Sequence, residues 1–167
     1  MKVQFSSAPW AEVPFTSGLH EASQIFSGIV WEEASAKYRF ECDTKIAAGL
    51  KPPKGVHASL NSIIDAKFKD DERQGCNGYF RKGRSRVRVT FRHKMSLGSD
   101  IYSALKVCKK EGVEVVIIIV ADKDTLHLIS PEDANSMMSF EDLQGEVQGL
   151  TGVIDIPLLI GRLVQWA

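Results

Sequence analysis

The sequence predicts an α/β fold built on a mixed sheet that is flanked by helices. Residues 85–93 alternate between basic and apolar side chains, which is typical of a strand with two different faces. Residues 113–120 (VEVVIIIV) are almost purely apolar and β-branched, as in a strand that is covered on both faces. Residues 156–164 (IPLLIGRLV) supply a further apolar strand.

The chain has 167 residues, of which 44% are hydrophobic and 25% charged, so we expect a single domain spanning residues 1–167. Its formal net charge is zero, and any attraction to a polyanion must therefore come from local segregation of charge. Such segregation exists, because basic residues are concentrated between Lys67 and Lys110 and acids dominate from Glu111 onward.

Cys42, Cys76 and Cys108 lie far apart without a CxxC pair, which indicates neither a disulfide framework nor a zinc site. The longest apolar run, VVIIIVA at 115–121, is too short to span a bilayer. We therefore expect a cytoplasmic protein with reduced thiols and no membrane partner.

In the N-terminal half, we expect irregular chain through Gly18 and then one amphipathic helix over residues 19–37, where apolar residues recur at helical spacing. Residues 37–46 (KYRFECDTKI) alternate well enough to predict a strand. Glycines and prolines at 48–55 end it, and a second helix is predicted over residues 57–72.

The best-defined part is a right-handed βαβ unit at about residues 85–120, with its two strands parallel. Its helix is predicted to begin after Ser99 as N-cap and to end at Gly112. Further along the chain, helix starts are predicted at Ser130 and at Ser139, each with an acid in the position that closes a capping box.

A cationic row lies along the first strand of this unit. Its members are Arg84, Arg86, Arg88, Arg92 and Lys94, interrupted by Thr90, and the opposite face carries Val87, Val89 and Phe91. Neighbours on one strand face lie about 7 Å apart, so each adjacent pair of charges repels by roughly 0.6 to 2.4 kcal/mol. Acidic partners or a bound polyanion must offset that cost.

Two interpretations of this row compete. It is either a solvated edge strand whose like charges prevent aggregation, or a surface that binds phosphates. The next predicted strand offers only Glu114 as an acidic partner, which favours a nucleic acid. We therefore expect the five basic residues to bind nucleic acid, and we expect replacing Arg88 and Arg92 by Gln to leave thermal stability nearly unchanged.

The order of these elements resembles the catalytic half of BamHI/BglII-type restriction endonucleases, a branch of the PD-(D/E)XK nuclease superfamily. The resemblance rests on RVRVTFRHKMSLGSDIYSALKVCKKEGVEVVIIIVADKDTL and on the terminal LTGVIDIPLLIGRL. Upstream, residues 58–74 and 20–34 are similar to the family's helices. The resemblance implies a restriction-endonuclease-like mixed sheet.

The resemblance also implies where the metal site of the family would lie. The family strand carries a metal-binding Glu where this chain has Arg88, a Glu or Gln where it has Thr90, and an upstream acid where it has Asn77. These nucleases hold Mg²⁺ with carboxylates. The expected function is thus a nucleic-acid-binding domain, with duplex DNA as partner, that is catalytically degenerate and holds no metal or other cofactor.

Two alternatives remain open at this stage. The first is an active, divergent Mg²⁺-dependent deoxyribonuclease whose carboxylates come from Glu41, Asp43 or Asp65, where ECDTK imitates a (D/E)XK set on one strand face. The second is an interaction module whose basic face meets an acidic protein. The sequence also leaves a homodimer open, with room for an interface on the N-terminal helices.

Overall fold

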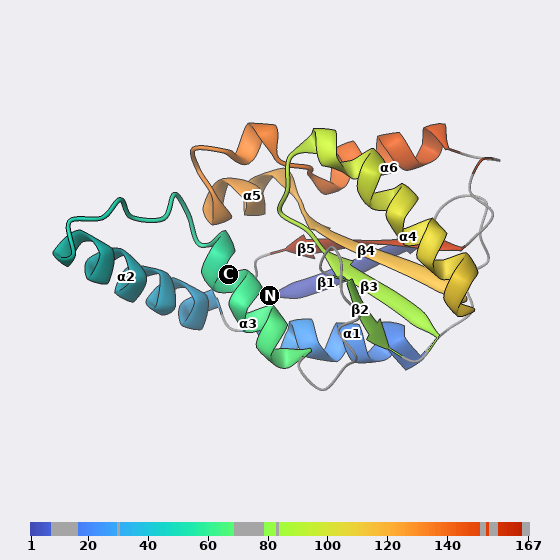
Figure 1. Cartoon of the computed structure of the whole chain (residues 1–167), viewed down its shortest axis with the longest axis horizontal. Coiled ribbons are helices and arrows are strands. Elements are labelled where there is room, and N and C mark those ends of the chain that lie inside the picture. The colour runs from blue at the N-terminus through green and yellow to red at the C-terminus, as the bar shows by residue number, and fades with distance from the viewer. Residues whose placement is uncertain are drawn as a thin grey trace.

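The computed structural model describes residues 1–7, 17–29, 31–68, 79–82, 84–150, 153 and 157–164. Its centre is a five-stranded mixed sheet in the order β1-β5-β4-β3-β2 (Figure 1). The strands are β1 (Lys2–Ser7), β2 (Tyr79–Lys82), β3 (Ser85–Val89), β4 (Val115–Ala121) and β5 (Leu158–Val164). Strands β3, β4 and β5 are parallel, and the two outer strands β1 and β2 pair antiparallel to them.

The predicted βαβ unit is confirmed. β3 and β4 pair in parallel with Arg88 opposite Ile118, and α4 (Leu97–Glu111) connects them. Gly112 ends this helix with a φ of 65°, a conformation that glycine adopts without steric cost. The helix begins at Leu97. Ser99 therefore lies inside the first turn, and the prediction that it is the N-cap is wrong.

Side-chain alternation along β4 builds two apolar cores, one on each face of the sheet. Ile117 and Ile119 point into the first core, whereas Val116 and Ile118 point into the second, and all four are almost fully buried. A strand that is apolar at every position is thus explained by a sheet covered on both sides.

Helices supply the two covers (Figure 1). They are α1 (Ser17–Ser27), α2 (Trp31–Ala47), α3 (His57–Lys67), α5 (Lys123–Ile129) and α6 (Phe140–Gly149), together with α4. The first core contains Phe26 of α1, Leu60 of α3 and Leu126 of α5. The second core contains Leu97 and Ile101 of α4 and Leu143 of α6.

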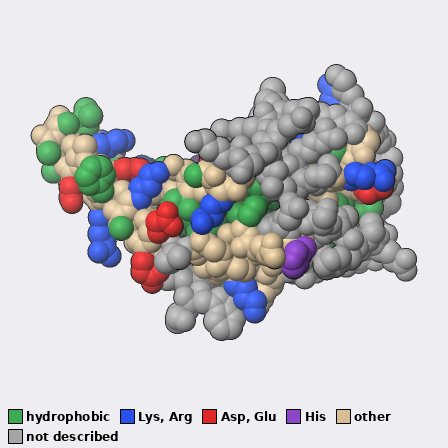
Figure 2. Space-filling view, turned by 90° about the horizontal axis from the view of Figure 1, so that it is seen from below, with side chains coloured by type: hydrophobic (Ala, Val, Ile, Leu, Met, Phe, Trp, Pro, Cys, Tyr) green, Lys and Arg blue, Asp and Glu red, His purple; other side chains and the backbone are tan. Residues whose placement is uncertain are grey.

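The strand predicted at residues 37–46 is wrong, because this segment forms the second half of α2. Only Ala34 of α2 is buried. Burial therefore imposes no hydrophobic pattern on this segment, neither the two-residue period of a strand nor the 3.6-residue period of a helix. Glu32 and Glu33 in the first turn and Lys45 in the last turn match the helix dipole. In Figure 2 the projecting end that contains α2 carries apolar and charged side chains side by side.

Three other predictions are corrected. The opening segment contains β1, which pairs with β5. The single helix at residues 19–37 is two helices, with α1 ending at Ser27. The helix predicted from Ser130 is a turn and a short 3-10 helix at Ala134–Ser136, whereas α5 begins after Asp122, whose side chain accepts a hydrogen bond from the Thr125 amide.

The segment before α3 is fixed by a close backbone contact. A Cβ atom on Gly55 would lie 2.4 Å from the carbonyl oxygen of Ile129, so no larger residue fits there. The next residue, Val56, donates its backbone N–H to the same oxygen at 2.7 Å. At the other end of α3, Phe68 stacks on Phe80 of β2 with ring centroids 4.4 Å apart. Both ends of α3 are thereby tied to the body of the fold.

The capping box predicted at Ser139 is confirmed. The Ser139 hydroxyl accepts a hydrogen bond from the Asp142 backbone N–H at 3.1 Å. In return, the Asp142 carboxylate accepts one from the Ser139 backbone N–H at 3.3 Å. Partial burial raises the pKa of Asp142, but hydrogen bonds from Lys94 and Ser139 outweigh it and hold the pKa below its ordinary value of 3.8.

A depressed pKa links this box to acid stability. The carboxylate binds protons less readily in the folded state, so its stabilising contribution is full above pH 3.8 and is lost as the pH falls below that value. We expect the chain to unfold at a higher temperature than Asp142→Asn at pH 7, and this difference to shrink in thermal melts below about pH 4. A difference that stays constant down to pH 2 would contradict the assignment.

Candidate functional site

The polar face of β3 does not face solvent. Arg86 and Arg88 are only 3% and 2% exposed, because they point into the layer between the sheet and helices α4 and α6. The prediction of one continuous, exposed cationic row is therefore wrong for these two residues. Alternation along a strand identifies a face but does not say whether water or a helix covers it.

A carboxylate from α4 neutralises part of this buried charge. Asp100, itself 4% exposed, accepts Arg88 Nη2 at 2.8 Å with one oxygen and Arg92 Nη1 at 3.2 Å with the other. The Asp100 carboxylate thus joins a buried guanidinium group to an exposed one. The Arg88 side chain is 3% exposed, whereas that of Arg92 is 55% exposed. The buried Arg88 and the exposed Arg92 are thus held next to each other by one carboxylate.

Two other basic residues of the row, Arg84 and Lys94, also have acidic partners. Arg84 pairs with Glu114 at 2.6 Å, and Lys94 pairs with Asp142 at 2.8 Å. Arg84 lies at the start of β3 and Arg92 beyond its end, roughly 26 Å apart for an extended chain. The five residues therefore divide into one exposed residue at the start, two buried ones, and Arg92 and Lys94 at the carboxyl end.

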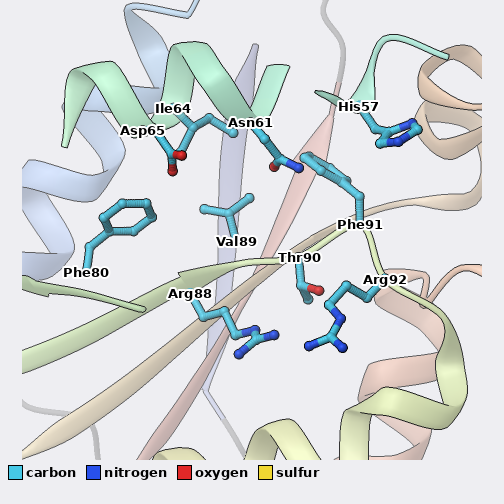
Figure 3. Close-up of a pocket in the computed structure, with 10 residues that line it drawn as sticks. All are labelled: His57, Asn61, Ile64, Asp65, Phe80, Arg88, Val89, Thr90, Phe91 and Arg92. Atoms are coloured by element: carbon cyan, nitrogen blue, oxygen red, sulfur yellow. The ribbon is translucent and has the colours of Figure 1, made fainter. Parts of the chain in front are cut away.

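A cleft opens beside the carboxyl end of β3 (Figure 3). The antiparallel ladder with β2 stops at the pair Tyr79 and Arg88, so β2 does not cover the edge of β3 beyond that point. The cleft has a volume of about 410 Å³. Its lining residues are His57, Asn61, Ile64, Asp65, Phe80, Arg88, Val89, Thr90, Phe91 and Arg92.

The cleft contains polar atoms that the described residues leave without a partner. Thr90 is 5% exposed, and its hydroxyl oxygen has no hydrogen-bond partner among the described residues. His57 Nδ1 is likewise buried without a partner in the described part of the chain. Such groups cost free energy unless water or a ligand completes them. The cleft is therefore suited to a polar ligand.

The three carboxylates considered for a relocated metal site do not lie together on one face of a strand, as the sequence predicted for ECDTK, because they belong to two helices. Glu41 and Asp43 lie on α2, and Glu41 accepts a hydrogen bond from Ser59 at 3.2 Å. Asp65 lies on α3 and lines the cleft. Within the described ranges, no three His, Cys, Asp or Glu side chains gather as a metal site would require. Asn77 lies outside the described residues.

The parallel βαβ unit, the antiparallel outer strands and the helices on both faces together define the restriction-endonuclease-like α/β fold. A solved structure of restriction endonuclease BglII complexed with a DNA 16-mer is similar to this chain, with a TM-score of 0.68. The match has 17% sequence identity and covers 99% of this chain and 78% of BglII. At this identity the likeness establishes the fold.

No protein-family model matches the sequence, and neither does any curated protein. In the described part of the chain, no helix has the length and apolar character needed to cross a membrane.

Sequence reasoning missed Asp100 as a member of the site. It is the acid in the first turn of α4, where the positive end of the helix dipole favours a carboxylate. The sequence contained a usable signal, since in a βαβ unit the first turn of the helix follows directly after the carboxyl end of the first strand. An acid there is well placed to meet basic residues at the end of that strand.

The buried pair makes a quantitative prediction. Because Asp100→Asn would leave the buried Arg88 without its carboxylate, we expect it to lower the free energy of unfolding by about 3 kcal/mol in urea denaturation. The expectation that replacing Arg88 and Arg92 together by Gln leaves stability nearly unchanged is therefore corrected: because Arg88 is buried and ion-paired, we expect a comparable loss. Glu114→Gln, which breaks the exposed pair with Arg84, should cost at most about 1 kcal/mol. Equal losses for the two variants would show that burial does not matter at Asp100.

Proposed function

We propose that the chain is a single nucleic-acid-binding domain, residues 1–167, that binds duplex DNA and does not cut it. One observation carries the proposal: Arg88 and Arg92 share a single carboxylate at the end of β3, beside an open cleft. The similarity of the fold to an endonuclease solved with DNA supports a nucleic acid as the ligand. The exposed guanidinium group of Arg92 at this edge supports a phosphate as the group that is bound.

The same charges argue against a resident magnesium ion at this place. A guanidinium about 4 Å from a dication repels it by roughly 8 kcal/mol at an effective dielectric of 20. Arg88 stands where the resemblance places a metal-binding Glu, so it inverts the electrostatics of the site. Arg92, whose side chain is 55% exposed beside it, is the arginine that meets a phosphate directly.

The contact surface that we propose is narrower than the five residues predicted from the sequence. Arg92 and Lys94 are about half exposed at the carboxyl end of β3. Lys123 and His127 of α5 are exposed, and together with Lys94 they line a smaller hollow of about 170 Å³. Arg86 and Arg88 are buried, and we assign them to support this surface from inside.

The proposal retains the cytoplasmic location that the cysteine pattern predicts, and Cys42 is a free thiol. It applies equally to one chain or to a homodimer on the duplex. An active nuclease remains the competing function, because Asp65 lines the cleft and provides one carboxylate there.

The first test is the salt dependence of binding to duplex DNA. Each phosphate neutralised contributes roughly 0.9 to the slope of log affinity against log salt. We expect the double variant Arg92→Gln and Lys94→Gln to reduce this slope by up to about two units in fluorescence anisotropy titrations. Lys45→Gln on the exposed end of α2 is the matched control and should leave the slope unchanged. A double variant that binds like the parent would remove the basis for this surface.

The second test concerns catalysis. We expect supercoiled plasmid DNA to remain intact with the purified chain in the presence of Mg²⁺ or Mn²⁺, because Arg88 repels a dication at the end of β3. Agarose electrophoresis over several hours measures this. Cleavage that Asp65→Asn abolishes would instead establish the active nuclease.

A further inference from the structure

We propose that the cleft between α3 and the end of β3 holds one unpaired nucleotide of the bound nucleic acid. Its base would lie against α3 and its phosphate on the side of Arg92. This inference rests on the proposed nucleic-acid binding and adds to it the part of the ligand that enters the cleft. Three features of the cleft support it: the arrangement of its polar groups, their charges, and its size.

The polar groups of the cleft form two sets separated by apolar side chains (Figure 3). Asn61 and Asp65 project from α3 toward Val89, whereas Thr90 and Arg92 lie on the other side of β3. Val89 lies between the two sets, with Phe80 and Phe91 to either side of it (Figure 3). A nucleotide has the same layout, with a polar base edge, apolar base faces and an anionic phosphate at the opposite end.

The α3 set is suited to a base edge. Asn61 and Asp65 are four residues apart on one helix, so their side chains lie on the same face one turn apart. The amide offers two donors and an acceptor, and the carboxylate offers acceptors only. A carboxylate that accepts two neighbouring N–H groups, beside an amide that donates to a carbonyl, complements the Watson–Crick edge of guanine best among the four bases.

The charges orient the ligand. The Asp65 carboxylate disfavours a phosphate near α3, whereas Arg92 and the buried Arg88 attract one at the opposite side. Thr90 lies between these two arginines, and its hydroxyl has no partner among the described residues. A phosphate oxygen would complete that hydroxyl's hydrogen bonding. The nucleotide therefore enters with its base toward α3 and not the reverse.

The size of the cleft supports more than a phosphate alone. Its volume of about 410 Å³ falls within the range of roughly 300 to 1,000 Å³ that small-molecule sites occupy. Taking a base out of a duplex costs a few kcal/mol, and the cost is smallest where the base is already unpaired. The cleft should therefore favour nucleic acid that carries a single-stranded end over a blunt duplex.

The experiment compares a blunt duplex with the same duplex carrying a three-nucleotide overhang, in separate 5′ and 3′ forms, by fluorescence anisotropy at fixed salt. Stacking and edge contacts to one base should give at least one overhang form roughly tenfold higher affinity than the blunt duplex. Within that form, guanine as the first unpaired nucleotide should bind more tightly than thymine.

Two variants in the cleft test whether this preference arises there. Asn61→Ala and Asp65→Asn should each reduce the preference for the overhang while leaving blunt-duplex affinity within about twofold. Removing a negative charge by itself would strengthen binding of both ligands, so a loss confined to the overhang identifies a direct contact. Asp43→Asn on α2 removes the same charge away from the cleft and is the matched control. Thermal melts confirm that each variant is folded.

The outcomes separate the inference from the proposed function. Equal affinity for blunt and overhanging DNA, or a preference that survives both cleft variants, would overturn the nucleotide site while leaving duplex binding intact. Failure to bind either DNA would overturn both. A preference that both variants abolish, and that Asp43→Asn retains, supports the site.

Discussion

The buried ion pair between Arg88 and Asp100 is the interaction on which the rest of the site depends. It joins the carboxyl end of β3 to the first turn of α4, with both partners at most 6% exposed at their side chains. A charge in such a place is costly unless its partner stays within hydrogen-bond distance. The pair therefore fixes how α4 lies over β3, and with it the start of the connecting segment, where Arg92 lines the cleft. Arg92, bound to the same carboxylate, is held at the rim.

This pair also determines which charged groups lie at the carboxyl end of β3. In the parallel βαβ unit, the polar side chains at the end of the first strand are an arginine, Arg88, and a threonine, Thr90. Carboxylates there would attract a divalent cation, whereas guanidinium groups attract the phosphate itself. Asp100 comes from the helix and is already engaged by two arginines.

The cleft exists because two structural features coincide. The β2 ladder stops at Arg88, so the last residues of the extended segment have an edge that β2 does not cover. α3 is held across from this edge at both ends, by the close contact at Gly55 and by the stacking of Phe68 on Phe80. The polar side chains of α3 that face away from the first core then meet the cleft. Rigid supports on both sides are what a selective binding site requires.

The sequence by itself determined the elements whose pattern is imposed by burial or by local hydrogen bonds. β4 follows from VEVVIIIV, the end of α4 from Gly112, and the start of α6 from Ser139 with Asp142. The sequence could not decide whether the second half of α2 is a helix or a strand. Only Ala34 of that helix is buried, so the alternation of its polar residues carries no structural information. Nor could it decide the fate of the arginines. Whether the polar face of β3 meets water or a helix depends on where α4 packs. Only the tertiary structure places Asp100 against Arg88, because this contact joins two elements whose packing no local sequence pattern specifies.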